Sequence, residues 1–189
     1  MTRRALVALV LGGARSGKSA HAEALARRLA GARGACVYIA TAEAFDDEMR
    51  ARIALHRARR GAPWRTREAP LDLAAAIREE AGPGRAVLVD CLTVWTGNLM
   101  HAGRDVPAAM EALVAALVAA RGPVVLVASE VGLGIVPDNA MARAFRDHAG
   151  RLSQAVAAVA GHVDLVAAGL PLALKRPRPA RRQARKTTR

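Results

Sequence analysis

The chain has 189 residues, 52% of them hydrophobic, and a formal net charge of +13. That length suits one domain with a sizeable core. The lack of an apolar run near ~20 residues argues against a membrane span. The first apolar run is short and leads into a glycine loop, which predicts a strand and no signal peptide. Cys36 and Cys91 show no metal or redox spacing, so we expect reduced, buried thiols in a cytoplasmic protein.

The positive charge is concentrated at the end of the chain. Eight of the 29 basic residues and no acidic residue lie in 175–189, which leaves 21 basic against 16 acidic residues, or +5, elsewhere. We therefore expect a folded domain over 1–174 and a disordered basic tail over 175–189. The tail is expected to be a solvated extension. Contact with acidic membrane surfaces or nucleic acid is the alternative, although 3% aromatic residues provide little for base stacking.

The strongest motif lies near the N-terminus. An apolar run from Ala5 to Leu11 leads into G-x-x-x-x-G-K-S, and a helix is predicted over 20–31. In that strand–loop–helix context the backbone N–H groups surround phosphates, and the helix N-terminus adds positive charge. Lys18 can reach the β- and γ-phosphates as a catalytic group, and the Ser19 hydroxyl can bind Mg²⁺. The predicted phosphate-binding residues are Gly12, Gly13, Ala14, Arg15, Ser16, Gly17, Lys18 and Ser19.

Strands and helices alternate along the rest of the chain. Strands are predicted over 35–40, 64–68, 86–91, 123–129, 162–168 and 170–174, with Pro171 favouring an edge position for the last. Helices are predicted over 46–60, 70–80 with Pro70 at its start, 93–101, 106–120, and from Asp138 or Asn139 to about Ala160. This alternation predicts an α/β fold: a three-layer P-loop NTPase-like domain with a mostly parallel sheet and helices on both faces.

A second nucleotide group is expected at Asp90, which ends the apolar strand 86–91. An Asp at that place in phosphate-loop proteins holds Mg²⁺ directly or through water. The alternative is that Asp90 caps the following helix. Glu130 ends a neighbouring strand and competes for the metal role, or could orient an acceptor hydroxyl.

The predicted helix 46–60 places Arg52, His56 and Arg60 on one stripe. Arginines bind phosphate oxygens through their planar fork, and their charge favours a neutral imidazole. Neutral imidazole can attack phosphorus and form a covalent intermediate. The alternative is a solvated basic face on which His56 is incidental. His21, His101, His148 and His162 show no such constellation and are interpreted as ordinary residues.

Four blocks of residues, in order and register, together resemble one enzyme family. They are Leu11 to Ser19 with His21-Ala22-Glu23; Tyr38 to Ala42, Asp47-Glu48-Met49, Arg52-Ile53, His56-Arg57, Trp64 to Thr66 and Glu68; Asp90 to Thr93 with Asn98-Leu99; and Glu130 to Gly132, Gly134 to Pro137 and Phe145 to Asp147 with Gly150. The sequence resembles the bifunctional adenosylcobinamide kinase / adenosylcobinamide-phosphate guanylyltransferase family of cobalamin biosynthesis.

The resemblance implies two reactions. ATP or GTP phosphorylates adenosylcobinamide, and GMP is then transferred from GTP to that phosphate through a histidine, which falls on His56. The family's further nucleotide contacts fall on Ala40, Thr41, Ala42, Arg57, Ala58, Arg59, Arg60, Glu68 and Asp90. The resemblance also implies a homo-oligomer.

Three positions depart from the family pattern. Ser129 and Ser153 stand where members commonly have Asn, and Gly61 stands where Pro often follows the arginine. Serine lacks the paired donor and acceptor of an amide, so a substrate contact at Ser129 would differ. Two rival functions remain: a kinase of another small acceptor, with His56 only contacting phosphate, and a nucleic-acid-binding NTPase that uses its basic tail.

Overall fold

The computed structural model describes residues 6–32, 34–42 and 64–176. The described elements, in chain order, are β1 (Val7–Gly12), α1 (Lys18–Ala30), β2 (Ala35–Ala40), β3 (Trp64–Glu68), α3 (Leu73–Glu80), β4 (Arg85–Asp90), α4 (Leu92–His101), α5 (Val106–Ala119), β5 (Val124–Ser129), α6 (Ala140–Val159), β6 (His162–Ala167) and β7 (Leu170–Lys175). None of the described helices is long and apolar enough to cross a bilayer.

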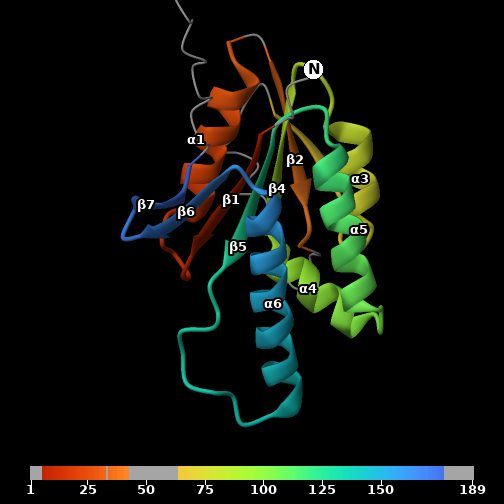
Figure 1. The fold of residues 1–189 in the computed structure, drawn as a ribbon, viewed down its shortest axis with the longest axis vertical. Helices are drawn as coiled ribbons and strands as arrows, with labels where there is room; N and C mark the ends of the chain where they lie inside the picture. The colour runs from red at the N-terminus through yellow and green to blue at the C-terminus, as the bar shows by residue number, and fades with distance from the viewer. Residues whose placement is uncertain (1–5, 33, 43–63, 177–189) are drawn as a thin grey trace, which may run out of the picture.

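The strands form one seven-stranded sheet in the order β3-β2-β4-β5-β1-β6-β7 (Figure 1). Neighbouring strands run parallel except β7, which is antiparallel to β6. β7 is an edge strand and contains Pro171, which tolerates that position because proline has no N–H to donate. The predicted mostly parallel α/β sheet is confirmed.

Helices cover both faces of the sheet, so the predicted three layers are present (Figure 1). Helix α1 packs on one face with Val10 and Val127, whereas α3, α4, α5 and α6 pack on the other face with Leu9 and Leu126. Successive strand residues point to opposite faces, and both faces are covered. This is why the central strands are continuous apolar runs in the sequence rather than alternating ones.

Several predicted boundaries differ from the structure. Helix α3 begins at Leu73, not Pro70, with Asp72 at its N-cap position. Of the two predicted caps for α6, Asn139 is the one used, since its side chain accepts from the Ala142 N–H. The predicted last strand, 170–174, is one residue short, because β7 ends at Lys175. The predicted helix 46–60 lies outside the described residues, as do residues 177–189.

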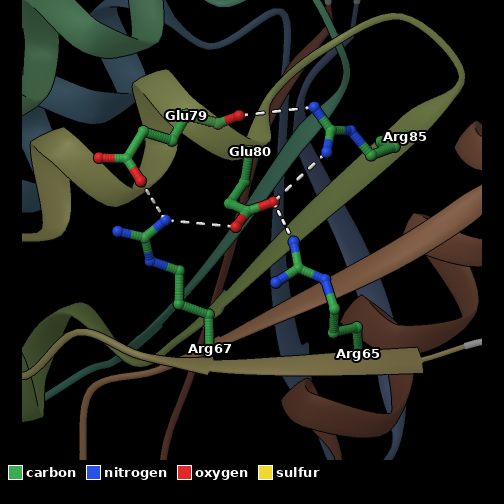
Figure 2. A network of polar contacts seen from close by, with 5 residues as sticks. All are labelled: Arg65, Arg67, Glu79, Glu80 and Arg85. Atoms are coloured by element: carbon green, nitrogen blue, oxygen red, sulfur yellow. Dashed lines mark hydrogen bonds and ion pairs between the residues drawn. The ribbon is translucent and has the colours of Figure 1, made fainter.

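A cluster of charged side chains fastens the edge strand β3 to α3 (Figure 2). The Glu80 carboxylate is 6% exposed, and it accepts hydrogen bonds from Arg65 and, at 3.2 Å, from Arg67. Arg85 lies 3.6 Å from the same carboxylate, and Arg67 also pairs with Glu79. Burial alone would raise the pKa of Glu80, but the two hydrogen-bonded guanidinium groups hold it below its ordinary value. The cluster therefore fixes β3, whose last residue is Glu68.

Candidate functional site

The predicted phosphate loop has the expected local structure. Strand β1 ends at Gly12, and α1 begins at Lys18. A Cβ on Gly12 would lie 2.5 Å from Ser16 Oγ and 2.6 Å from the Val166 carbonyl oxygen, so only glycine fits there. Gly17 has φ +94°, a left-handed conformation that glycine adopts without strain. The two motif glycines thus permit the tight turn that brings successive N–H groups to one side.

The loop presents its polar groups at an open surface. Gly13, Ala14, Arg15 and Gly17 are exposed, and Ser19 is half-buried at the first turn of α1. The Lys18 ammonium donates to the Gly13 carbonyl oxygen at 3.1 Å, so its side chain lies along the loop. An anion over this loop would meet backbone N–H groups, the positive end of a helix and an ammonium group.

The carboxyl ends of β2 and β4 meet at the same edge of the sheet. Thr41 is fully buried, and its hydroxyl donates to the Cys91 carbonyl and accepts from the Cys91 N–H, both at 2.8 Å. Asn98 of α4 donates to the Thr41 carbonyl at 2.7 Å. Ala40 to Ala42 are thereby held beside Asp90, which pairs in register with Ala40.

Asp90 does not cap the following helix. The N-cap of α4 is Cys91, whose sulfur accepts from the Val94 N–H at 3.5 Å. The peptide bond between Asp90 and Cys91 is cis. Burial, followed by the charge of Asp90, raises the pKa of the Cys91 thiol to about 11, and the charge of Lys18 opposes this.

Glu130 lies between these groups, because β5 separates β4 from β1. Its N–H donates to the Gly12 carbonyl at 3.0 Å, and its carboxylate accepts from the Gly132 N–H at 2.6 Å. Glu68 is exposed at the end of β3 and pairs in register with Ala40. The carboxylates of Glu68, Asp90 and Glu130 therefore follow three different strands at one edge, where open α/β sheets bind ligands.

Mg²⁺ fits the type of donor at Ser19 and Asp90, which are a hydroxyl and a carboxylate at this edge. Among the residues that the structure describes, no group of three or more His, Cys, Asp and Glu side chains could hold a metal.

Five of the predicted site residues lie outside the residues that the structure describes. They are His56, Arg57, Ala58, Arg59 and Arg60. The approach of His56 to the phosphate loop, and its role, therefore stay predictions. The described part of the site comprises the loop, the ends of β2, β3 and β4, and Glu130.

A constellation around Asp164 was not predicted from the sequence. This aspartate in β6 is 1% exposed. One of its carboxylate oxygens accepts hydrogen bonds from His21 of α1 and from His162, each at 2.8 Å. Arg176 binds the other oxygen at 2.6 Å. Burial alone would raise the pKa of Asp164, but hydrogen bonds from His162, His21 and Arg176 lower it to about 2. The sequence pattern did not indicate this cluster, because Asp164 lies 143 residues from His21 along the chain.

An apolar cavity of about 580 Å³ lies between α4 and α6. Its lining includes Val94, Gly97, Met100, Met141, Ala142 and Phe145. Thr93 also borders the cavity, and its hydroxyl accepts from the Ser129 N–H at 2.7 Å. Ser129 directly precedes Glu130, so this cavity adjoins the same edge of the sheet.

The sheet order, the glycine loop between β1 and α1, and the acidic strand ends define a P-loop NTPase-like α/β protein. The model of the family "Cobinamide kinase / cobinamide phosphate guanyltransferase" matches residues 8–174. The chain belongs to this family, which is a family of enzymes.

Three relatives match over most of their length. The "bifunctional adenosylcobalamin biosynthesis protein CobP" of Pseudomonas aeruginosa is 51% identical over 170 residues, covering 88% of this chain and 96% of that protein. The proteins named CobU in Salmonella typhimurium and Escherichia coli are 44% and 42% identical, each over 90% of this chain and all of the relative. A solved structure of an ATPase domain aligns with a TM-score of 0.47 at 12% identity, covering 86% of this chain and 69% of that one.

Proposed function

We propose that this enzyme phosphorylates adenosylcobinamide with ATP or GTP and then transfers GMP from GTP to the product. Adenosyl-GDP-cobinamide and pyrophosphate are formed. The observation that carries the proposal is the phosphate loop 12–19 beside Asp90, in a chain whose family combines the two activities. We include in the proposal a homo-oligomeric, cytoplasmic enzyme without a specific nucleic-acid partner.

In the kinase step, an acceptor hydroxyl attacks the γ-phosphorus while the bond to the β-phosphate oxygen breaks. The Lys18 ammonium exchanges its Gly13 carbonyl partner for phosphate oxygens and stabilises the charge of the transferring group. Glu130 or Asp90 is placed at the strand ends to accept the proton of the hydroxyl. Mg²⁺, held by Ser19 and Asp90, would supply further positive charge to the phosphates.

In the guanylyl step, His56 attacks the α-phosphorus of GTP, and pyrophosphate leaves. The phosphate of adenosylcobinamide phosphate then attacks the same phosphorus and releases the imidazole. Arg57, Arg59 and Arg60 would bind phosphate oxygens during this transfer. We place an apolar part of the acceptor in the cavity between α4 and α6, which adjoins the strand ends.

The decisive experiment is covalent labelling with GTP that carries ³²P at its α-phosphate. The wild-type enzyme should acquire an acid-labile, base-stable label, and His56→Ala should acquire none. His148→Ala is the matched control, since His148 of α6 does not line the cavity between α4 and α6 and should leave labelling intact. An unlabelled wild-type enzyme, or equal labelling of His56→Ala, would contradict the guanylylated histidine and favour the kinase-only rival.

A further inference from the structure

The hairpin of β6 and β7 lies directly against the phosphate loop. The Gly169 N–H, in the turn between the two strands, donates to the Ser16 carbonyl at 2.8 Å. A Cβ on Gly17 would lie 3.2 Å from the Gly169 Cα, so the two glycines pack backbone against backbone. The turn itself is tight, with Ala168 at φ +51° and Gly169 at φ +79°. The hairpin therefore contacts the part of the loop that is expected to surround the phosphates.

This contact orients one peptide unit of the loop. In a trans peptide the carbonyl and the N–H point in opposite directions. Because the Ser16 carbonyl points at Gly169, the N–H of the same peptide unit, which belongs to Gly17, points away from the hairpin. A preset N–H direction strengthens anion binding, since the donor needs no rearrangement when the phosphate arrives.

The buried Asp164 carboxylate fastens this hairpin in place. It joins three parts of the chain: α1 through His21, β6 through His162, and the residue after β7 through Arg176. His21 follows Lys18 and Ser19 within the first turn of α1, so the same carboxylate also holds the start of the loop helix. Lys175 adds hydrogen bonds to the Ala157 and Ala158 carbonyls near the end of α6.

We propose that the β6–β7 hairpin presets the phosphate loop for nucleotide phosphates, with Asp164 as its positioning residue. Asp164 acts through His21 and Arg176, and the Gly169 N–H transmits the position to the Ser16–Gly17 peptide. The inference rests on nucleotide binding at the phosphate loop, which belongs to the proposed function. Its test measures nucleotide binding alone, so failure of the cobinamide chemistry would be seen separately, as absent turnover with normal nucleotide affinity.

The test compares full-length variants by titration with fluorescent ribose-labelled GTP and GDP. Asp164→Asn should bind both about tenfold more weakly, because a preset donor is lost. Arg176→Gln should bind both nucleotides about threefold more weakly, and the affinity of Arg176→Lys should stay within twofold of that of the wild type. Arg104→Gln is the matched control. The Arg104 side chain is 54% exposed, close to the 47% of Arg176, and it pairs with Asp72 at 3.6 Å. Loss of the Arg104 charge should not alter the affinity for GTP or GDP.

Amide hydrogen exchange supplies the second measurement. In Arg176→Gln the Gly169 amide should exchange about tenfold faster than in the wild type, while that of Val10 in the core of β1 should not change. If Asp164→Asn fails to fold, Arg176→Gln decides. Wild-type affinity in folded Asp164→Asn and Arg176→Gln, or unchanged exchange at Gly169, would overturn the proposal. A merely structural role predicts lower stability with normal affinity, which the titration would reveal.

Discussion

The Asp164 carboxylate is buried in the folded chain, where two imidazoles and a guanidinium group hydrogen-bond to it. Its pKa is about 2 in the folded protein and 3.8 as the ordinary value. A lowered pKa in the folded state means that the unfolded chain binds the proton more tightly. The resulting stabilisation is complete above about pH 4 and is lost as the pH falls through 2.

We therefore predict a steeper acid-induced loss of stability in the wild type than in Asp164→Asn. Between pH 4 and 2 the free energy of unfolding should fall by about 2 kcal/mol more in the wild type. Urea unfolding at a series of fixed pH values measures this free energy for each protein. Asp147→Asn is the control, since Asp147 is 52% exposed and should keep the wild-type slope. Parallel slopes for wild type and Asp164→Asn would contradict the assignment.

Residues that act locally were predictable from the sequence, and those that act at a distance were not. Gly12, Gly17 and Lys18 do their work within one strand–loop–helix unit, so their spacing sufficed. His21 and Asp164 are 143 residues apart, so the local sequence pattern around one residue does not predict a contact with the other. Cys91 was missed as the cap of α4 because sulfur is a weak acceptor and Asp90 precedes it.

Among the elements, β3 is held in part by charged side chains. Its five residues, Trp64 to Glu68, have an exposed or half-buried pattern, so little apolar burial holds this edge strand. The ion cluster around Glu80 supplies the attachment instead (Figure 2). The sequence predicted an extended segment here but not its partner helix, because that pairing depends on the tertiary fold.

Replacing Glu80 by Gln should weaken the attachment of β3 to α3. Three guanidinium groups would lose a shared buried carboxylate, and the free energy of unfolding should fall by about 2 kcal/mol after allowance for the exposure of the arginines. Glu79→Gln is the control: Glu79 is 60% exposed, so its loss should change stability by less than about 1 kcal/mol. Urea denaturation of both variants measures the difference. Equal losses would show that the buried carboxylate has no special role.

At the scale of the whole molecule, the fold separates two kinds of surface at one edge of the sheet. The phosphate loop and the acidic strand ends lie over β1 to β4, and the apolar cavity lies between α4 and α6. The alternation of strands and helices predicted the layers and the parallel sheet. It did not predict the cavity, which forms only where two helices distant in sequence approach each other.

This separation predicts that acceptor and nucleotide binding can be altered independently. Met141 lines the cavity and is 67% exposed, so Met141→Asp should be accommodated by the fold. We expect the KM for adenosylcobinamide to rise about tenfold, because a charge in an apolar cavity disfavours the apolar part of a ligand bound there. The affinity for GTP should stay within twofold of the wild type. Steady-state kinetics measure the KM for adenosylcobinamide, and nucleotide titration measures the affinity for GTP. An unchanged KM would place the acceptor outside this cavity.

The contact between Lys18 and the Gly13 carbonyl has a consequence for the entropy of ligand capture. A long cationic side chain that is free in solution loses about 0.5–1.5 kcal/mol of rotamer freedom when a ligand immobilises it. Here the chain's own carbonyl already restrains the ammonium, so that freedom was lost during folding. An incoming triphosphate replaces one oxygen partner by another, and its capture requires little further ordering of the lysine.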